Sequence, residues 1–141
     1  MEERETVHVN ATLETLPELL SWVHKVVAKA QWNKTQAMQF ELVLEEAIVN
    51  IVMHAYARQG GPLEIEAVLI PQESLTFILT DQGEPFDPLS APLKESVPED
   101  EIVEGGLGVK LMRLYCDSLH YQRVGNSNQL TLSKSTTSSS Q

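Results

Sequence analysis

Hydrophobic and polar positions follow regular patterns along the first 60 residues of this chain. Apolar residues alternate with polar ones over Thr6–Leu13, which predicts a half-buried strand. Over Leu16–Ala30 they recur at helical spacing, with Thr15 as an N-cap and Pro17 in the first turn, and this predicts a helix. A longer helix is expected over Gln36–Arg58. It is apolar around most of its circumference, which predicts burial on more than one side.

The second half of the chain reads as two hairpins separated by a long connection and a helix. The connection, residues 82–104, carries four of the seven prolines and has no periodicity, as is typical of a lid or binding loop. A third helix is expected to open at Gly105–Gly108. Four strands are expected at Leu63–Ile70, Leu75–Thr80, Leu119–Val124 and Gln129–Ser133. Antiparallel strand pairs with helices between them predict an α+β two-layer sandwich.

Composition and charge narrow the class of protein. The 141 residues fit one domain, expected over 1–134, and the Ser/Thr-rich residues 135–141 are expected to form a disordered tail. A formal net charge of −10 argues against direct nucleic-acid binding and is compatible with basic protein partners. The charged amino terminus and the lack of a long apolar run predict neither a secretory signal nor a membrane span, so the expected compartment is the cytoplasm.

A polar stripe interrupts the apolar second helix. Glu46 and Asn50 are four residues apart and therefore share one face, and His54 continues that line. A polar stripe on a buried helix is costly unless it is satisfied or faces a wet cavity. The structural alternative is a helical side-chain pair on one solvated edge, which is common.

Two further motifs have the chemistry of a ligand site. Asp81 ends a strand, where its carboxylate could accept a hydrogen bond from a ligand amine, and Gly83 would let backbone approach that ligand. Gly105, Gly106 and Gly108 precede a helix, where converging amides and the helix dipole favour an anion, and Lys110 could add charge. Their structural alternatives are a simple turn and a flexible hinge.

The three motifs in this order describe a nucleotide pocket, and they resemble a known family. Glu46-x-x-x-Asn50, Asp81-x-Gly83 and Gly105-Gly106-Leu107-Gly108 resemble the N, G1 and G2 boxes of the GHKL ATPases. The run from Leu44 to Tyr56 is most similar to the N box of the stand-alone bacterial serine kinases that act as anti-sigma factors, the RsbW and SpoIIAB type. The resemblance extends from about Val7 to Lys134.

The resemblance implies a fold and a role for each site residue. The fold would be the GHKL, or Bergerat, fold: a mixed, mostly antiparallel sheet with helices on one face. Glu46 would be the general base and Asn50 a ligand of Mg²⁺ in the complex with ATP. Asp81 would accept a hydrogen bond from the adenine amino group, with Gly83 lining the base. The phosphates would contact Gly105, Gly106, Leu107, Gly108 and Lys110, whereas His54 receives no catalytic role.

The sequence departs from the family pattern at two places. Several relatives carry a glycine-threonine pair before the last strand, where the threonine helps to bind adenine, and here Ser127-Asn128-Gln129 stands in that place. The long connection is also acidic, and we expect it to be mobile or to face the partner protein rather than the phosphates. From residue 94 onward, Lys94 is its one basic residue, against the acidic residues Glu95, Glu99, Asp100, Glu101 and Glu104.

Three functions are compatible with these patterns. The first is an ATP-dependent protein-serine kinase that sequesters a sigma factor, phosphorylates a STAS-type anti-anti-sigma protein and forms a homodimer, as the resemblance implies. The second is a catalytically silent nucleotide-binding adaptor of the same fold, against which the retained Glu46 argues. The third is an α+β interaction module without a nucleotide site. The order of the motifs favours the kinase.

Overall fold

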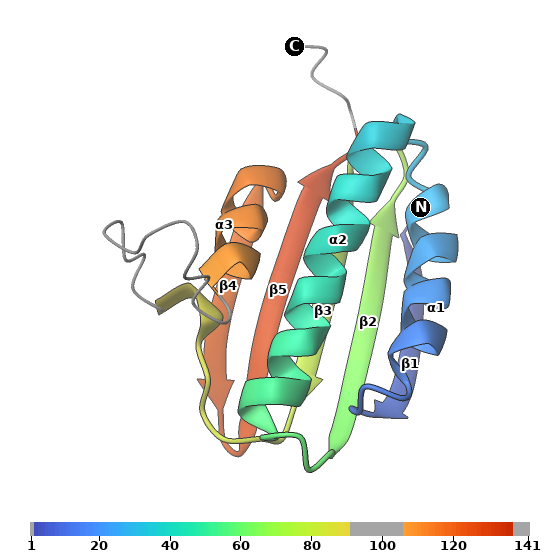
Figure 1. Ribbon diagram of the computed structural model, residues 1–141. Coiled ribbons are helices and arrows are strands. Elements are labelled where there is room, and N and C mark those ends of the chain that lie inside the picture. The colour runs from blue at the N-terminus through green and yellow to red at the C-terminus, as the bar shows by residue number, and fades with distance from the viewer. Residues whose placement is uncertain (1, 91–105, 137–141) are drawn as a thin grey trace.

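The protein forms a single sheet layer covered by a helical layer, in a computed structural model that describes residues 2–90 and 106–136 (Figure 1). The helices are α1 (Leu16–Ala28), α2 (Lys34–Asn50) and α3 (Gly106–Tyr115). A π-helical turn, Ile51–Ala55, continues α2, and a short 3₁₀ turn spans Pro88–Ser90. The strands are β1 (Glu3–Asn10), β2 (Pro62–Ile70), β3 (Ser74–Asp81), β4 (Ser118–Val124) and β5 (Ser127–Ser135).

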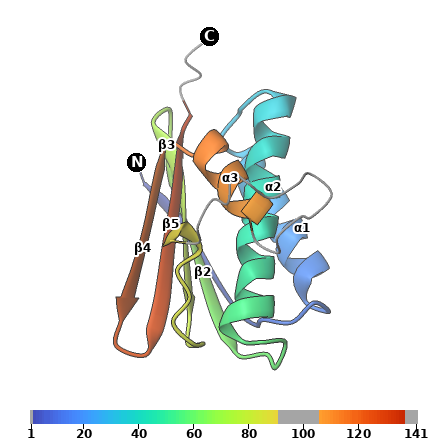
Figure 2. The same cartoon turned by 60° about the vertical axis from the view of Figure 1, so that its left-hand side comes forward.

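The described strands form one five-stranded sheet in the order β1-β2-β3-β5-β4, and every neighbouring pair is antiparallel. The three helices lie on the same face of this sheet, which leaves its other face uncovered (Figure 2). The expected α+β two-layer sandwich is confirmed. Because β3 and β5 are antiparallel, the carboxyl end of β3 lies beside the amino end of β5. Asp81 pairs with Asn128 at this place.

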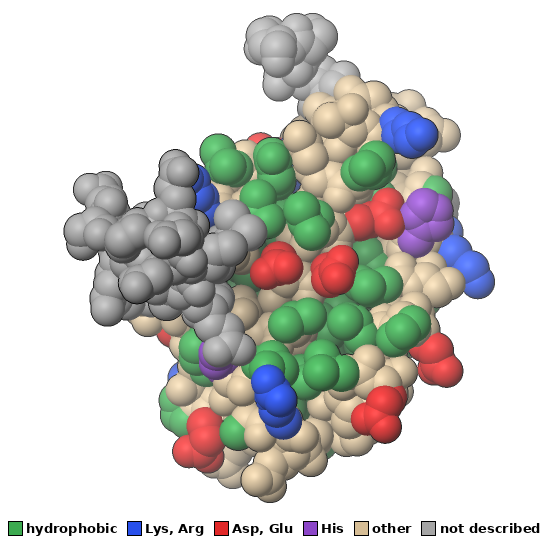
Figure 3. Space-filling view, in the orientation of Figure 1, with side chains coloured by type: hydrophobic (Ala, Val, Ile, Leu, Met, Phe, Trp, Pro, Cys, Tyr) green, Lys and Arg blue, Asp and Glu red, His purple; other side chains and the backbone are tan. Residues whose placement is uncertain are grey.

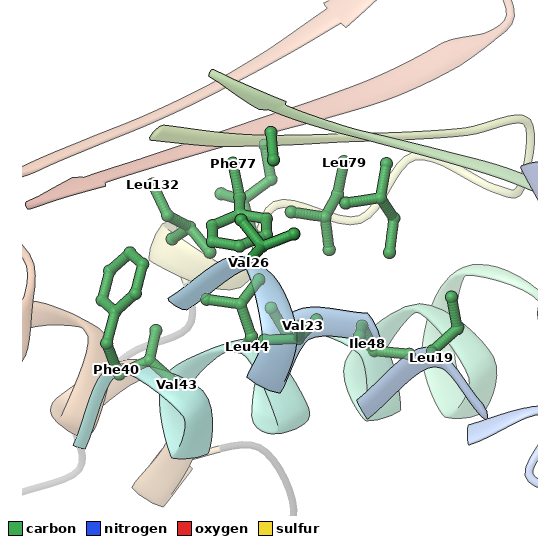
Figure 4. Packing of buried hydrophobic residues seen from close by; sticks show 14 of the residues in the cluster. Leu19, Val23, Val26, Phe40, Val43, Leu44, Ile48, Phe77, Leu79 and Leu132 are labelled. Carbon is green, nitrogen blue, oxygen red and sulfur yellow. The ribbon is translucent and has the colours of Figure 1, made fainter. Parts of the chain in front are cut away.

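The core lies between the sheet and the two long helices. α2 crosses the middle of the sheet, with α1 on one side of it and α3 on the other (Figures 1 and 4). This position explains why α2 is apolar around most of its circumference, as the sequence predicts. Phe40, Leu44 and Ile48 of α2 are fully buried against the sheet. Phe40 also contacts Phe77 of β3, with ring centroids 5.9 Å apart.

The first strand is shorter at its carboxyl end than the alternation predicts. β1 stops at Asn10, and Leu13 is 50% exposed rather than buried in phase with Val7 and Val9. The reason is local hydrogen bonding: the Thr15 hydroxyl donates to the Asn10 carbonyl oxygen at 2.7 Å and bends the chain there. Thr15 therefore precedes α1 without capping it through its side chain, whereas Pro17 does lie in the first turn.

The last strand, β5, is longer than the sequence predicts. Ser135 is the last residue of β5, and the Thr136 amide donates to the Glu73 carbonyl oxygen at 2.9 Å. These two residues therefore belong to the folded domain, although the sequence assigned them to a tail. Residues 137–141 and the acidic part of the long connection, 91–105, lie outside the described residues. Among the helices described, none has both the length and the apolar content that crossing a bilayer would require.

Replacing Phe77 with alanine tests the role of the core. Phe77 is fully buried and meets Trp22 and Phe40, so Phe77→Ala should lower the free energy of unfolding by about 3–5 kcal/mol. Urea unfolding followed by circular dichroism measures this loss. Thr131→Ala, on the uncovered face of the sheet, is the matched control and should cost less than about 1 kcal/mol. Equal losses in the two variants would contradict the assignment of the core.

Candidate functional site

The glycine cluster and the α2 polar stripe meet at Glu46. Gly108, in the first turn of α3, lies so close to α2 that a methyl group there would come within 3.0 Å of Glu46 Oε1 and 3.2 Å of its Cβ. A larger residue at this position would require the Glu46 side chain to shift. Burial, together with the negative charge of Glu45, raises the pKa of Glu46, which makes its carboxylate a stronger base than an exposed glutamate.

One turn further along α2, the Asn50 carboxamide is buried without a partner. Asn50 is 5% exposed, and its Nδ2 is enclosed yet forms no hydrogen bond with the residues that the structure describes. An unsatisfied buried amide costs about 1–3 kcal/mol, so such groups call for an explanation. A ligand that accepts a hydrogen bond from this amide would explain its burial. The structural alternative, in which Glu46 and Asn50 pair on a solvated edge of the helix, does not fit an Asn50 that is buried.

The helix then widens into a π-helical turn. The Tyr56 amide donates to the Ile51 carbonyl oxygen, five residues back, at 3.0 Å. Such turns insert one extra residue into a helix and are frequent at functional sites. The sequence pattern did not predict this turn: it indicated one continuous helix over Gln36–Arg58. Here the turn directs the Ala55 carbonyl oxygen to the loop after β3.

That loop is held against the turn by backbone contacts. The Glu84 amide donates to the Ala55 carbonyl oxygen at 2.8 Å. A methyl group on Gly83 would lie 2.4 Å from the same oxygen, so no larger residue fits at this position without moving backbone. Gly83 is thus needed for the close approach of two protein segments, in addition to any contact with a ligand.

Asp81 is a buried carboxyl at the end of β3. It is 3% exposed, and its Oδ1 accepts hydrogen bonds from the Gly83 amide and from Asn128 Nδ2, both at 2.8 Å. Burial raises the pKa of Asp81, and the two hydrogen bonds and the Arg123 guanidinium oppose that rise. Arg123 also donates to the Gly83 carbonyl oxygen at 2.8 Å, so it fixes the loop as well.

The residue that the sequence interpretation assigned no function, Asn128, is part of this cluster. Asn128 is 3% exposed and is bonded directly to Asp81. Its signal in the sequence is its phase: it alternates with Leu130 and Leu132, which places its side chain on the buried face of β5. An asparagine at a buried strand position requires hydrogen-bond partners, and the neighbouring strand end provides them.

His54 belongs to the π-helical turn and contacts the loop after β3. Its ring stacks on that of Phe86, with centroids 4.9 Å apart and an angle of 21° between the planes. The stack joins the π-helical turn to the segment that follows Gly83. His54 thus contacts the site through Phe86.

The remaining predicted residues belong to the start of α3. Gly106 and Leu107 are its first two residues, Lys110 is exposed on its first turns, and Gly105 lies outside the described residues. The helix dipole at this end favours a negatively charged group. No distance places Lys110 against the other site residues, so its role toward a phosphate stays a prediction.

Two hollows elsewhere on the surface do not coincide with this site. The larger, of about 910 Å³, lies at the opposite end of β3; among its lining residues are Lys29, Gln72 and Thr136. The smaller, of about 320 Å³, lies on the helical face, where hydrophobic side chains surround acidic ones (Figure 3). It is lined by Leu20, Met38, Glu41, Leu42 and Glu45.

The donor set fits Mg²⁺ bound to a nucleotide better than a metal held by protein alone. The described residues contain no cluster of three or more histidine, cysteine or carboxylate side chains suited to a metal ion. Mg²⁺ is commonly held by one or two protein oxygens, with phosphate oxygens and water as its other ligands. The Asn50 side chain has one oxygen to offer such an ion, and its buried Nδ2, which has no partner among the described residues, can donate a hydrogen bond to a phosphate oxygen.

Comparisons with known proteins show the family of this chain. The serine/threonine-protein kinase BtrW of Bordetella bronchiseptica is 32% identical over 132 residues, which cover 91% of each chain. The serine-protein kinase RsbW of Bacillus licheniformis is 28% identical over 104 residues, 69% of this chain and 64% of the relative. The anti-sigma F factor of Clostridium kluyveri is 34% identical over 86 residues, 59% and 58% of the two chains. The model of the histidine kinase-like ATPase domain matches residues 9–134, so the chain belongs to that family.

Proposed function

We propose that this chain is an ATP-dependent protein-serine kinase and anti-sigma factor of the RsbW type. It would phosphorylate a STAS-type anti-anti-sigma protein and sequester a sigma factor. The observation that carries the proposal is the contact between Glu46 and Gly108, which brings a base of raised pKa to the amino end of a helix. The kinase and anti-sigma names of the relatives support the same activity.

Each site residue would have a separate role in phosphoryl transfer. Asp81 would hold the adenine, Asn50 would hold the Mg²⁺, and the amides at the start of α3 would bind the phosphates. Bound Mg²⁺ would neutralise charge on the phosphates during transfer. Glu46 would accept the proton of a serine hydroxyl while the serine oxygen forms a bond to the γ-phosphorus. The bond from that phosphorus to the β–γ bridging oxygen breaks at the same time, and ADP leaves with the bridging oxygen.

The surface charge supports a protein partner of basic character. The net charge is −10, and the hollow on the helical face places Glu41 and Glu45 beside Met38 and Leu42. Those two apolar side chains are 60% and 40% exposed. Exposed apolar residues bordered by charge are typical of protein-binding surfaces, and opposite charge speeds encounter. Glu45 of this surface is adjacent in sequence to Glu46, so a partner seated there would lie near the catalytic base.

Glu46→Gln tests the catalytic base. Glutamine keeps the size of the side chain beside Gly108 but cannot accept the serine proton, so phosphotransfer should fall by about 10²–10⁴-fold while Mg-ATP still binds. Transfer of labelled γ-phosphate to the STAS protein encoded by the same organism measures this. Glu73→Gln, in the turn between β2 and β3, is the charge-matched control and should behave as wild type. Transfer that is absent in wild type despite ATP binding would favour the catalytically silent adaptor.

Asn50→Ala separates the ligand role of Asn50 from a structural one. Because its Nδ2 is buried without a partner, removing the carboxamide should leave the unfolding midpoint of the free protein unchanged or higher. Wild type should gain about 2.7 kcal/mol at a Mg-ATP concentration 100 times its dissociation constant, and the variant should gain none. Thermal unfolding with and without Mg-ATP measures both effects. A variant that is destabilised when free yet still responds to Mg-ATP would contradict this role.

The pH dependence of transfer should report the raised pKa of Glu46. Protonation removes the base, so the single-turnover rate should fall as pH decreases through a midpoint above the ordinary glutamate value of 4.5. The negative charge of Glu45 contributes to the rise, so Glu45→Gln should move that midpoint to lower pH. An acid limb that is unaffected by Glu45→Gln and persists in Glu46→Gln would assign the titration to another group.

A further inference from the structure

Asn128 uses all of its hydrogen-bonding capacity within the cluster around Asp81. Its Nδ2 donates to Asp81 Oδ1 and to the Glu84 carbonyl oxygen, both at 2.8 Å. Its Oδ1 accepts from the Tyr121 hydroxyl at 2.5 Å and from the Phe86 amide at 3.3 Å. A carboxamide offers two donor hydrogens and two acceptor positions, and each has a partner here.

These partners allow only one orientation of the carboxamide. If the amide turned over, its nitrogen would face the Tyr121 hydroxyl and the Phe86 amide, and its oxygen would face the Asp81 carboxylate and the Glu84 carbonyl. The Tyr121 hydroxyl could accept from the nitrogen, but at Asp81, Glu84 and the Phe86 amide like groups would oppose each other in a buried site, which is costly. Asn128 is therefore fixed with a donor directed at Asp81.

The fixed donor determines what Asp81 can offer to a ligand. The hydrogen bonds that the carboxylate accepts from Gly83 and Asn128 both end on Oδ1. Oδ2 receives none from residues 2–90 or 106–136. The carboxylate thus presents one acceptor oxygen. An exocyclic amino group can donate to that oxygen, whereas a carbonyl at the same position would face it with like partial charge.

Asn128 also connects this carboxylate to the loop that follows β3. The same amide holds the Glu84 carbonyl and the Phe86 amide, and the Phe86 ring stacks on His54. Displacing Asn128 would therefore release both the carboxylate and the backbone beside it. No other described side chain bonds to both Asp81 and this loop segment.

We propose that Asn128 is a positioning residue that sets the nucleobase specificity of the site, by holding Asp81 so that a purine with a 6-amino group is bound and a purine with a 6-carbonyl group is rejected. The proposal rests on the proposed function only in that the ligand is a purine nucleotide. Tyr121 supports it by fixing Asn128 from the neighbouring strand β4.

The test compares the dissociation constants of Mg-ATP and Mg-GTP by isothermal titration calorimetry. Wild type should prefer ATP. Asn128→Ala should weaken ATP binding by about tenfold or more while GTP binding changes less, so that the ATP/GTP preference falls. Asn128→Thr keeps one hydroxyl donor for Asp81 and should recover part of that preference. Tyr121→Phe, a conservative change, should reduce the preference by less than Asn128→Ala.

Gln129→Thr is the matched control, because Gln129 is the next residue of β5, half-buried on the opposite face of the strand. Its nucleotide preference should equal that of wild type. The proposal is overturned if Asn128→Ala and Tyr121→Phe keep the wild-type preference, or if every variant loses ATP and GTP affinity by the same factor. It is also overturned if wild type binds both nucleotides equally, a result that leaves the kinase proposal intact. Binding of neither nucleotide by wild type would reject both proposals.

Discussion

The close approach of two glycines to α2 is the constraint on which the site depends. Gly108 lies against the Glu46 side chain, and Gly83 lies against the Ala55 carbonyl oxygen. In both contacts a single added methyl group would meet α2 at 3.0 Å or less. Without these two contacts, the start of α3 and the loop after β3 would stand away from the helix. Glu46, Asn50 and Asp81 would then no longer form one candidate site.

The sequence predicted the architecture well because the core pattern is strong. The phases of Phe77 and Leu79 on β3, and of Leu130 and Leu132 on β5, follow from strict alternation and agree with their burial. The boundaries were less predictable because local hydrogen bonds decide them. The Thr15 hydroxyl bends the chain after Asn10, and pairing with β3 extends β5 to Ser135. Hydrophobic periodicity contains no information about either.

The sequence indicated the residues of the candidate site but not the contacts between them. Spacing alone placed Glu46 and Asn50 on one face of α2, and the structure adds that Gly108 meets the first and that the second is buried without a partner. The π-helical turn could not be predicted in the same way, because over five residues its side-chain periodicity does not differ from that of an α-helix. The hydrogen bonds of Asn128 could not be predicted because they join segments distant in the sequence. The inward phase of Asn128 was the available signal. A polar residue at a buried strand position indicates a partner without saying which one.

The extra residue in the π-helical turn has a consequence for anyone who redesigns this domain. A regular α-helix over residues 51–55 would carry the same side chains. Its backbone amides, however, would donate to the carbonyl oxygen four residues back instead of five. The Ile51 oxygen would then accept from the Ala55 amide instead of the Tyr56 amide, and the changed backbone path would turn the Ala55 oxygen away from the Glu84 amide. Idealising that one turn would therefore detach the loop that carries Gly83 and Glu84 from the end of the helix. The irregular turn is therefore a feature that redesign has to retain.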